Sequence, residues 1–452
     1  MRWVVAFGLA VGATACSLFV DLSALRADPE SAPPDASTAD APDAPDAPEI
    51  GVGSGKTGPL EVKSDGAVIN AYAVVTANVQ IGDRHLVVDD VTGFTSGDVV
   101  LVWQATGATG VVSGQATTTI GPTASVGRYE LARVSSVEPA RVAVDRAMIS
   151  AYAAPGTQIV RVPELSELVV RSGGRLTAAP WDGARGGILA ALVAGPILVE
   201  GTISTDGAGF RGGAAFAPDD QTGGCPDLDG PPMLGYAQKG QGIATLPDAS
   251  LAGRGNIANG GGGGNCDDAG GGGGGGAGRG GRGGKDYSSL DVGGMGGAPL
   301  DAPARERLFM GGGGGAGSAD FNTHGIASGG SGGGIVFLRG RLLDLRGQIS
   351  ADGANGEGTP SILNGAGGGG GGGTVYVQVE QSPTCAGRLG ARGGNGGHCE
   401  SRHGPGGGGG GGRIRLESAA PACAREVGGG APGLSGTDPR GATGGEIGIG
   451  EL

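Results

Sequence analysis

The sequence has 452 residues, of which 105 are glycine, and its 31 basic and 44 acidic residues give a formal net charge of −13. The glycines follow no G-X-Y period, which excludes a collagen triple helix. Phosphate binding needs a basic patch, and none is visible in this acidic chain, so we expect no nucleic-acid partner. Only 4% of the residues are aromatic. Any core must therefore be built from Val, Ile, Leu and Ala.

The first sixteen residues, MRWVVAFGLAVGATAC, have the organisation of a bacterial export signal. Arg2 precedes the apolar run Trp3–Val11, which is shorter than the about 20 residues that a membrane-spanning helix needs. A cysteine directly after small residues resembles the lipobox of bacterial lipoproteins, whose thiol receives a diacylglyceryl group, although Ala13 replaces the usual Leu. The resemblance implies lipid on Cys16 and an envelope protein at the outer membrane, facing the exterior. The alternative is an ordinary secretory leader with an incidental cysteine.

The composition of residues 17–58 is unsuited to a hydrophobic core. They include APDAPDAPE, and the segment Asp28–Glu49 carries seven acidic residues and no basic one. Proline stiffens such a chain and like charges extend it. We therefore interpret residues 17–58 as a disordered tether between the membrane and the folded part.

Residues 59–165 carry the signals of a small all-β domain. Five short runs are rich in branched side chains and are bounded by Gly, Asp or Pro: His85–Val88, Val99–Trp103, Tyr129–Val134, Arg141–Val144 and Ile159–Val162. They show no 3.6-residue period. We expect an antiparallel sandwich or barrel that caps the open strand edge of a coil behind it.

A repeated phrase organises residues 166–452. GQISADG at 347–353 matches GTISTDG at 201–207 and GRLGARG at 387–393, with fainter echoes that begin at Gly174 and Arg425. A unit that repeats and cannot bury its apolar face alone is typical of a stacked coil. We expect an irregular parallel β-helix with a large insertion at 210–331. Two aliphatic rows would form its core: Val199, Leu345, Cys385 and Cys423, and Ile203, Ile349, Leu389 and Val427.

Five polyglycine tracts fall in the loops of this coil: Gly260–Gly264, Gly270–Gly276, Gly311–Gly315, Gly367–Gly373 and Gly406–Gly412. Ordering a residue costs about 1–2 kcal/mol, and a hydrogen bond returns about 0.5–1.5 kcal/mol net. One tract alone therefore cannot order itself. Several tracts can, if they lie side by side as polyproline-II strands, because backbones without Cβ atoms approach closely. The alternative is a set of disordered loops.

Several segments resemble one family of large bacterial surface proteins. TANVQIGDRHLVVDD, FTSGDVVLVWQATGA and ISTDGAGFRGG carry the likeness, which covers roughly residues 71–280 and continues in NGGGGGNCDDAGGGGGGGAGRGG. In that family a β-rich head leads into glycine-rich coils, and its members are described as lipoproteins or adhesin-like proteins. The resemblance implies display on the cell surface and adhesion or contact with an extracellular matrix. It carries over no catalytic residue.

Five cysteines follow the signal peptide, in a chain that we expect to be exported and able to keep disulfides. Cys385 and Cys423 fall in one register, so we expect a disulfide between neighbouring rungs. Cys225 and Cys266 would close the large insertion, and Cys399 is left over. Free thiols remain the alternative for both pairs, because sequence does not fix connectivity.

No group of catalytic residues stands out. HCESRH at 398–403 is a cluster of soft ligands, but it lacks a zinc-site pattern and a second ligand pair, so we expect no metal and no cofactor. The leading hypothesis is a membrane-tethered structural or adhesive surface protein without catalytic activity. Its partners would be extracellular polysaccharide or other cell-surface proteins. The alternative is a polysaccharide-binding or polysaccharide-degrading β-helix protein.

Overall fold

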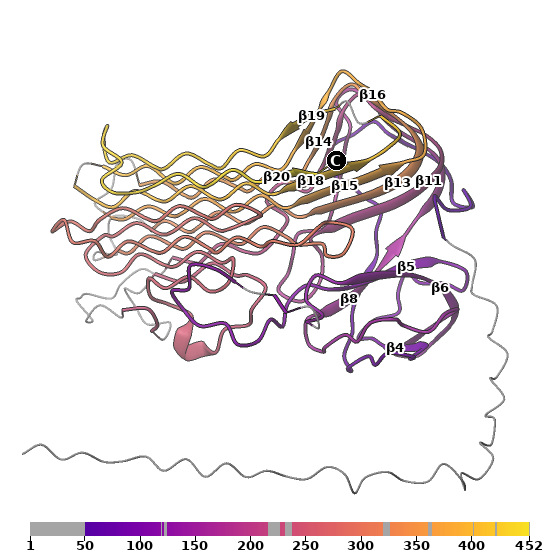
Figure 1. The fold of residues 1–452 in the computed structure, drawn as a ribbon, viewed down its shortest axis with the longest axis horizontal. Helices are drawn as coiled ribbons and strands as arrows, with labels where there is room; N and C mark the ends of the chain where they lie inside the picture. The colour runs from indigo at the N-terminus through magenta and orange to yellow at the C-terminus, as the bar shows by residue number, and fades with distance from the viewer. Residues whose placement is uncertain are drawn as a thin grey trace, which may run out of the picture. The chain divides into compact units, whose positions relative to one another are not determined.

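The computed structural model describes residues 50–118, 120–121, 124–215, 227–230, 237–319, 326–359, 364–400, 402–420 and 423–451. In this part of the chain the regular elements are β-strands, apart from one 3-10 helix, η1 (Asp248–Ser250). The strands form two parallel sheets and one antiparallel sheet (Figure 1). The expectation of an all-β chain with an antiparallel part and a parallel part is confirmed. The expected signal peptide, with Cys16, and the expected acidic tether up to residue 49 lie outside the described residues.

The antiparallel sheet is formed by residues 72–162. Its strand order is β3 (Tyr72–Val74), β8 (Thr157–Val162), β5 (Val99–Gln104), β6 (Tyr129–Glu138), β7 (Arg141–Val144) and β4 (His85–Val87). The sheet curls until its two outer strands approach each other at a bridge between Val75 and Val88. Its concave face buries its own apolar cluster, with Leu86, Val100 and Ile159 inaccessible to solvent.

The first parallel sheet collects one strand from each turn of the coil. Its strand order is β1 (Gly58–Val62), β9 (Glu164–Val170), β11 (Ile188–Val199), β13 (Ile335–Leu345), β15 (Thr374–Val379), β18 (Arg413–Glu417) and β20 (Ile449–Glu451), and β16 (Thr384–Cys385) also pairs with β13. The second parallel sheet has the order β19 (Ala424–Glu426), β17 (Arg388–Gly390), β14 (Gln348–Ser350), β12 (Thr202–Ser204), β10 (Arg175–Thr177) and β2 (Ala67–Val68). Outside the antiparallel sheet, the chain therefore passes in turn through the first and the second parallel sheet, with β15 and β16 together forming one passage through the first. One passage through both sheets is called a rung below.

The first parallel sheet is buried on both faces, which explains its continuous apolar runs. Within β11, Leu189 and Ala191 point into the cluster between the two parallel sheets. Their neighbours Ala190 and Leu192 belong to a second cluster, shared with the antiparallel sheet and the long segment between β12 and β13. Side chains of a strand point alternately to its two faces, so those of β11 contribute to both clusters.

Aliphatic side chains stack in rows from rung to rung. Leu176, Ile203, Ile349 and Leu389 pair in parallel register, as expected for the last three. The row does not continue with Val427, because Leu389 pairs with Arg425. The expected register is wrong by two residues at this last rung. A two-residue shift keeps the same side chains pointing inward, so the hydrophobic pattern alone cannot distinguish the two registers.

The coil begins before the antiparallel sheet, which corrects the expected boundaries. β1 pairs in parallel with β9, and β2 with β10, so residues 58–68 already belong to the two parallel sheets. Ile50 is buried in the second cluster, which the first parallel sheet shares with the antiparallel sheet, although residues 50–58 were expected to be tether. The local sequence pattern indicates strands in residues 58–68 but does not show which sheet they join. Only their long-range pairing with β9 and β10 assigns them to the parallel sheets.

The polyglycine tracts lie side by side and are joined through backbone amides. Along tract 367–373, successive N–H groups donate to three neighbours in turn. The pairs are Gly368 and Gly371 with tract 311–315, Gly369 and Gly372 with tract 406–412, and Gly367, Gly370 and Gly373 with segment 351–357. A repeat of three residues is the period of polyproline-II backbone. The expectation that the tracts pack against one another is confirmed.

We call these five tracts and the segments bonded to them the glycine array. Figure 1 shows it as wavy traces that run side by side away from β13, β15 and β18. Every residue of tract 367–373 is buried. A Cβ atom on Gly368 or Gly371 would lie closer than 3.0 Å to carbonyl oxygens of tract 270–276. Neither glycine has a left-handed backbone, so the close approach of neighbouring chains is what requires glycine here.

A buried carboxylate joins the antiparallel sheet to the coil. The side chain of Glu164, at the start of β9, is fully buried and accepts two hydrogen bonds from Arg133 of β6, at 2.7 and 3.0 Å. It also accepts the N–H of Ser54 at 2.9 Å and lies 3.5 Å from the ammonium of Lys56. Burial alone would raise the pKa of Glu164, but Arg133 and Ser54 outweigh it and lower this pKa from 4.5 to about 2.

We expect this carboxylate to make stability depend on acid pH. A lowered folded-state pKa contributes stability that is present above pH 4.5 and is lost as the pH falls from 4.5 toward 2. Glu164→Gln should remove about 3 kcal/mol at pH 7, because it leaves Arg133 without its carboxylate, and should flatten the acid dependence. Urea unfolding at pH 7, 4.5 and 3 measures both effects. Glu138→Gln, in an exposed pair with Arg141, is the control and should change stability by about 0.5 kcal/mol or less. Equal acid sensitivity of the Glu164 variant and the original chain would contradict this assignment.

Candidate functional site

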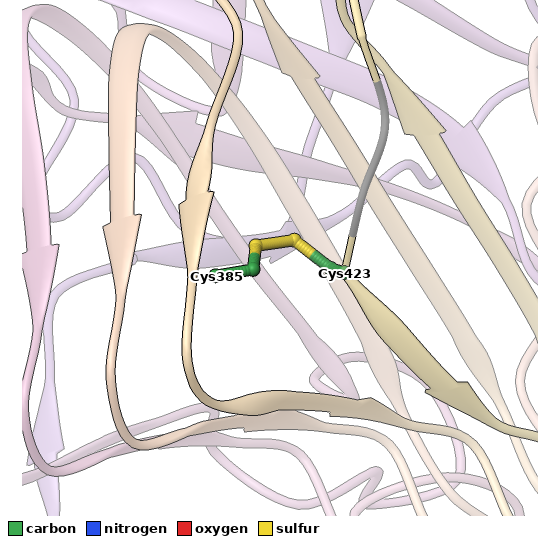
Figure 2. Close-up of a disulfide and its surroundings, with 2 residues drawn as sticks. All are labelled: Cys385 and Cys423. Atoms are coloured by element: carbon green, nitrogen blue, oxygen red, sulfur yellow. A yellow bond between two sulfur atoms is a disulfide. The ribbon is translucent and has the colours of Figure 1, made fainter.

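The predicted disulfide between Cys385 and Cys423 is confirmed. The two Cα atoms are 5.1 Å apart, and the bond joins β16 to the residue directly before β19 (Figure 2). Cys266 is also disulfide-bonded. Its expected partner Cys225 lies outside the described residues, so that pairing stays a prediction.

Cys399 is a free thiol that is buried in the protein. Its Sγ lies 3.1 Å from the carbonyl oxygen of His403, to which it donates. Burial raises the pKa of the Cys399 thiol to about 12, which keeps it protonated and poorly nucleophilic. His403 in turn lies 3.6 Å from the carboxylate of Asp268. Within the described part of the chain, no group of three or more His, Cys, Asp or Glu side chains could hold a metal ion.

Asp and Asn side chains at and after the end of the repeated phrase hold neighbouring rungs together. Asp206 accepts the N–H of Asp352 at 2.7 Å, and Asp352 accepts the N–H of Arg392 at 2.6 Å. Asn355 accepts the N–H of Asn395, which is 40 residues later, at 2.8 Å. Each side chain thus satisfies a backbone donor of the next rung. These polar residues therefore have a structural role.

One hollow of the described residues lies where the antiparallel sheet, the coil and the glycine array meet. It has a volume of about 380 Å³, within the usual size range for a small-molecule site. We call it the junction pocket, and define it by six of its lining residues: Thr106, Trp181, Phe210, Arg211, Gln238 and Gln241. Thr106 follows β5, Trp181 precedes β11, Phe210 and Arg211 follow β12, and the two glutamines belong to the long segment before β13.

Two aromatic side chains form the apolar wall of the junction pocket. Trp181 and Phe210 pack edge to face, with ring centroids 5.8 Å apart, and both are almost completely buried. The N–H of Trp181 donates to the carbonyl of Ala208 at 2.9 Å, which ties the loop before β11 to the turn after β12. The wall is therefore fixed by packing and by backbone bonds, and it does not depend on a ligand.

The glycine array holds the polar wall. In the sequence KGQG at 239–242, the glycines Gly240 and Gly242 lie so close to neighbouring backbone that a Cβ atom would clash. The backbone of Gln241 donates to the carbonyl of Arg211 at 2.9 Å and accepts from Gly313 at 2.9 Å. Gly240 and Gly242 thus allow this segment to pack closely against the array. The side chain of Gln241, between them, lines the pocket.

The glutamine amides are oriented by backbone donors. The side-chain oxygen of Gln241 accepts the N–H of Arg211 at 3.4 Å, and that of Gln238 accepts the N–H of Ala214 at 3.3 Å. Within the described residues their amide nitrogens take part in no further hydrogen bond. Arg211 donates through Nε to the carbonyl of Trp181 at 3.2 Å. The pocket therefore offers fixed donors beside an aromatic wall.

A buried lysine closes one side of the junction pocket. Lys239 has no exposed side-chain surface and forms an ion pair with Asp229. Its ammonium also donates to the hydroxyl of Ser113 at 2.9 Å. Burial lowers the pKa of Lys239, and Asp229 opposes that shift. The ammonium is occupied by these two partners, so we assign it a structural role.

A second hollow follows one corner of the coil across several rungs. It encloses about 630 Å³, is open to solvent and includes Gly201, Gly347 and Gly387, the first residues of the repeated phrase. A Cβ on Gly347 or Gly387 would clash with the backbone of the preceding rung. The glycines are thus explained by stacking of the rungs. Glu200 at its rim already pairs with Arg171 and Arg346, at 3.5 Å each. This corner is better described as a solvated, charge-paired face.

Comparison with known proteins gives no family assignment. No family model and no curated protein matches the chain. Among solved structures, the gp54 tailspike of Acinetobacter baumannii bacteriophage AP22, in complex with A. baumannii capsular saccharide, is similar at 10% identity and a TM-score of 0.19, over 83% of this chain and 62% of the tailspike. The tailspike protein gp49 from Pseudomonas phage LKA1 is similar at 7% identity and a TM-score of 0.17, over 81% of this chain and 63% of that one. This chain spans less than two thirds of either structure, and TM-scores of this size do not establish a shared fold.

The sequence did not predict the junction pocket. Its lining comes from four segments that are far apart along the chain, and no local motif connects them. No local signal marked Gln241 in particular, because single residues between two glycines, as in GRG at 253–255 and 278–280, recur along the chain. In the described part of the chain, no helix is long and apolar enough to cross a bilayer.

Proposed function

We propose that this protein is a surface-displayed polysaccharide-binding protein, and that the junction pocket holds one sugar residue of the polymer without cleaving it. The lining of the pocket carries the proposal. Sugar rings present apolar C–H faces and rows of hydroxyls, and the lining of the pocket combines two aromatic side chains with the amides of Gln238 and Gln241. The hydroxyl of Thr106 and the guanidinium of Arg211 add further hydrogen-bonding groups.

The chemistry of the lining favours binding over cleavage. Glycoside hydrolysis usually needs two carboxyl groups, one on each side of the scissile bond. The polar groups that line the described part of the pocket are amides, hydroxyls, a guanidinium and the paired ammonium of Lys239. These groups hold a sugar through hydrogen bonds. The protein would thus act as an adhesin, and degradation of the polymer is the alternative that the experiment must address.

In this proposal, the two parallel sheets form a parallel β-helix whose loops are polyproline-II strands, and lipid on Cys16 anchors it to the outer membrane. A stack held by backbone bonds on every rung suits a rigid stalk or platform.

If Cys16 carries the lipid, Cys16→Ser should move the protein from the membrane fraction to the soluble fraction of fractionated cells. Protease treatment of intact cells should release fragments of the folded part. An unchanged distribution of the variant would exclude the lipid anchor but leave the binding function standing.

The binding function is tested with a panel of purified neutral and acidic bacterial capsular polysaccharides. We expect Gln241→Leu to weaken binding of the recognised polymer about 10-fold in titration calorimetry, because it removes about 1.4 kcal/mol of hydrogen bonding at nearly constant volume. Gln80→Leu, on an exposed loop after β3, should leave binding unchanged and serves as the matched control. Chromatography of the polymer after prolonged incubation should show unchanged length. A shortened polymer would replace binding by degradation, and equal affinities of the two variants would remove the junction pocket from the proposal.

A further inference from the structure

The junction pocket contains an arginine that no acidic side chain of the described residues neutralises. Arg211 forms no ion pair within the described residues, although it lies in a chain of net charge −13. We propose, on the basis of the proposed function, that the sugar held there carries a carboxylate, as in a uronic acid, and that Arg211 binds this carboxylate. The ligand class is then an acidic polysaccharide.

The backbone holds Arg211 in place before any ligand arrives. Its carbonyl accepts the N–H of Gln241 at 2.9 Å, and its own N–H donates to the side chain of Gln241 at 3.4 Å. Its Nε donates to the carbonyl of Trp181 at 3.2 Å. A Cβ on Gly183 would lie 3.2 Å from Nη2, which places the guanidinium against the loop before β11. One of the five N–H groups of the fork is thus used to orient the group.

The other N–H groups of the guanidinium have the geometry that a carboxylate needs. A guanidinium binds a carboxylate through two parallel N–H···O bonds, and such charged bonds are about twice as strong as neutral ones. The side chain of Arg211 is exposed. A ligand can therefore reach it without displacing a protein partner. A neutral sugar hydroxyl could accept from the same group, but it would gain less.

Two acidic groups beside the described lining of the pocket, Asp182 and Asp229, are already occupied. Asp182, in the loop beside Arg211, accepts the N–H groups of Ala184 and Arg185 at 2.8 Å each. Asp229 is paired with Lys239. A carboxylate brought by a ligand would meet Arg211 as the unpaired cation of the described lining. Local positive charge offsets the general repulsion between an acidic polymer and this acidic chain.

The amides of Gln238 and Gln241 complete the recognition. Both belong to the same described pocket as Arg211, and their oxygens are held by backbone N–H groups. Their amide nitrogens can donate to ring hydroxyls next to the carboxylate. Two neutral groups and one cation would thus distinguish a uronic acid from the corresponding neutral hexose by charge, and from a simple organic acid by its hydroxyls.

The experiment compares polymers that differ only in the carboxylate. Polygalacturonate, alginate and hyaluronate are each titrated beside their carboxyl-reduced forms, in which –COO⁻ has become –CH₂OH. We expect the full chain to bind at least one acidic polymer about 10- to 100-fold more tightly than its reduced form. Arg211→Gln should abolish that difference, and Arg211→Lys, which keeps the charge but not the fork, should retain part of it. Arg141→Gln, on β7 outside the pocket lining, is the matched control and should bind as the original chain does.

The outcomes separate this inference from the function on which it rests. Equal binding of acidic and reduced polymers, or full affinity of a folded Arg211→Gln variant, overturns the carboxylate assignment and leaves polysaccharide binding standing. Failure to bind any polymer of this set or of the neutral and acidic capsular panel overturns both. Thermal unfolding of each variant shows whether it is folded, and Arg211→Lys provides a second test if the glutamine variant is not.

Discussion

Replacing Gly371 by alanine should destabilise the protein by about 4 kcal/mol, although the change adds only one methyl group. The methyl would lie closer than 3.0 Å to the carbonyl oxygen of Gly275 in the neighbouring tract. Overpacking of a tight core costs about 1–3 kcal/mol, and sometimes more. The N–H of Gly371 also donates to Gly312, and its carbonyl accepts from Gly333, both at 2.8 Å. Moving the tract to relieve the clash would weaken these bonds, each worth about 0.5–1.5 kcal/mol.

The glycine array should resist such a change more strongly than an ordinary core. Side chains in an aliphatic core can adopt other rotamers, whereas the nearest neighbours of the new methyl at Gly371 are all backbone atoms. That backbone is itself bonded to further tracts, so a local shift would be transmitted to them. Urea unfolding at neutral pH measures the loss. Hydrogen exchange should show lost protection in tracts 270–276, 311–315 and 367–373.

Gly428→Ala is the matched control. This glycine lies at the end of the array and has no left-handed backbone, and a Cβ atom added to it would meet no described atom within 4 Å. Alanine there should change stability by about 0.5 kcal/mol or less, since the small gain from reduced backbone entropy of the unfolded chain meets no opposing clash. If the two alanine variants are equally stable, the tracts do not pack in solution as described.

Local chemistry and repetition made part of this architecture predictable. The repeated phrase at 201–207, 347–353 and 387–393 correctly placed Ile203, Ile349 and Leu389 in one row, because each phrase has the same corner glycine and the same inward-pointing residue. The ordering argument for the glycine tracts also succeeded. It depended only on entropy and hydrogen bonding, which are the same for every glycine.

Prediction failed where the outcome depended on long-range pairing. The hydrophobic pattern allowed either Arg425 or Val427 beside Leu389, because both registers keep the pleat alternation. What distinguishes them lies outside the strand: Asn395 accepts the N–H of Ala431, 36 residues later, at 2.9 Å. The expected register required a step of 38 residues, from Leu389 to Val427. The junction pocket escaped prediction for a related reason, since Trp181, Arg211 and Gln241 meet only through the packing of separate loops.

Loss of the disulfide between Cys385 and Cys423 should cost about 4 kcal/mol. The bond closes a loop with a sequence separation of 38 residues, and the chain-entropy estimate for a loop of that length is about 4 kcal/mol. The double variant Cys385→Ser/Cys423→Ser should therefore unfold at lower urea concentration under non-reducing conditions. Cys399→Ser replaces a buried free thiol and is the matched control, with a smaller expected loss of about 1 kcal/mol.

The position of this bond indicates which part of the coil it protects. β19 is the outer strand of its sheet, and within the described residues it pairs only with β17. The row that carries Leu389 ends there with Arg425, whose Nε and Nη2 atoms are buried without a hydrogen-bond partner among the described residues. A terminal rung gains stacking energy on one side only, and a buried unsatisfied donor lowers its stability further. In the double variant, hydrogen exchange should accelerate first in β19 and β20, while β9 and β11 stay protected. Uniform acceleration throughout the coil would show that the disulfide supports the whole stack and not its last rung.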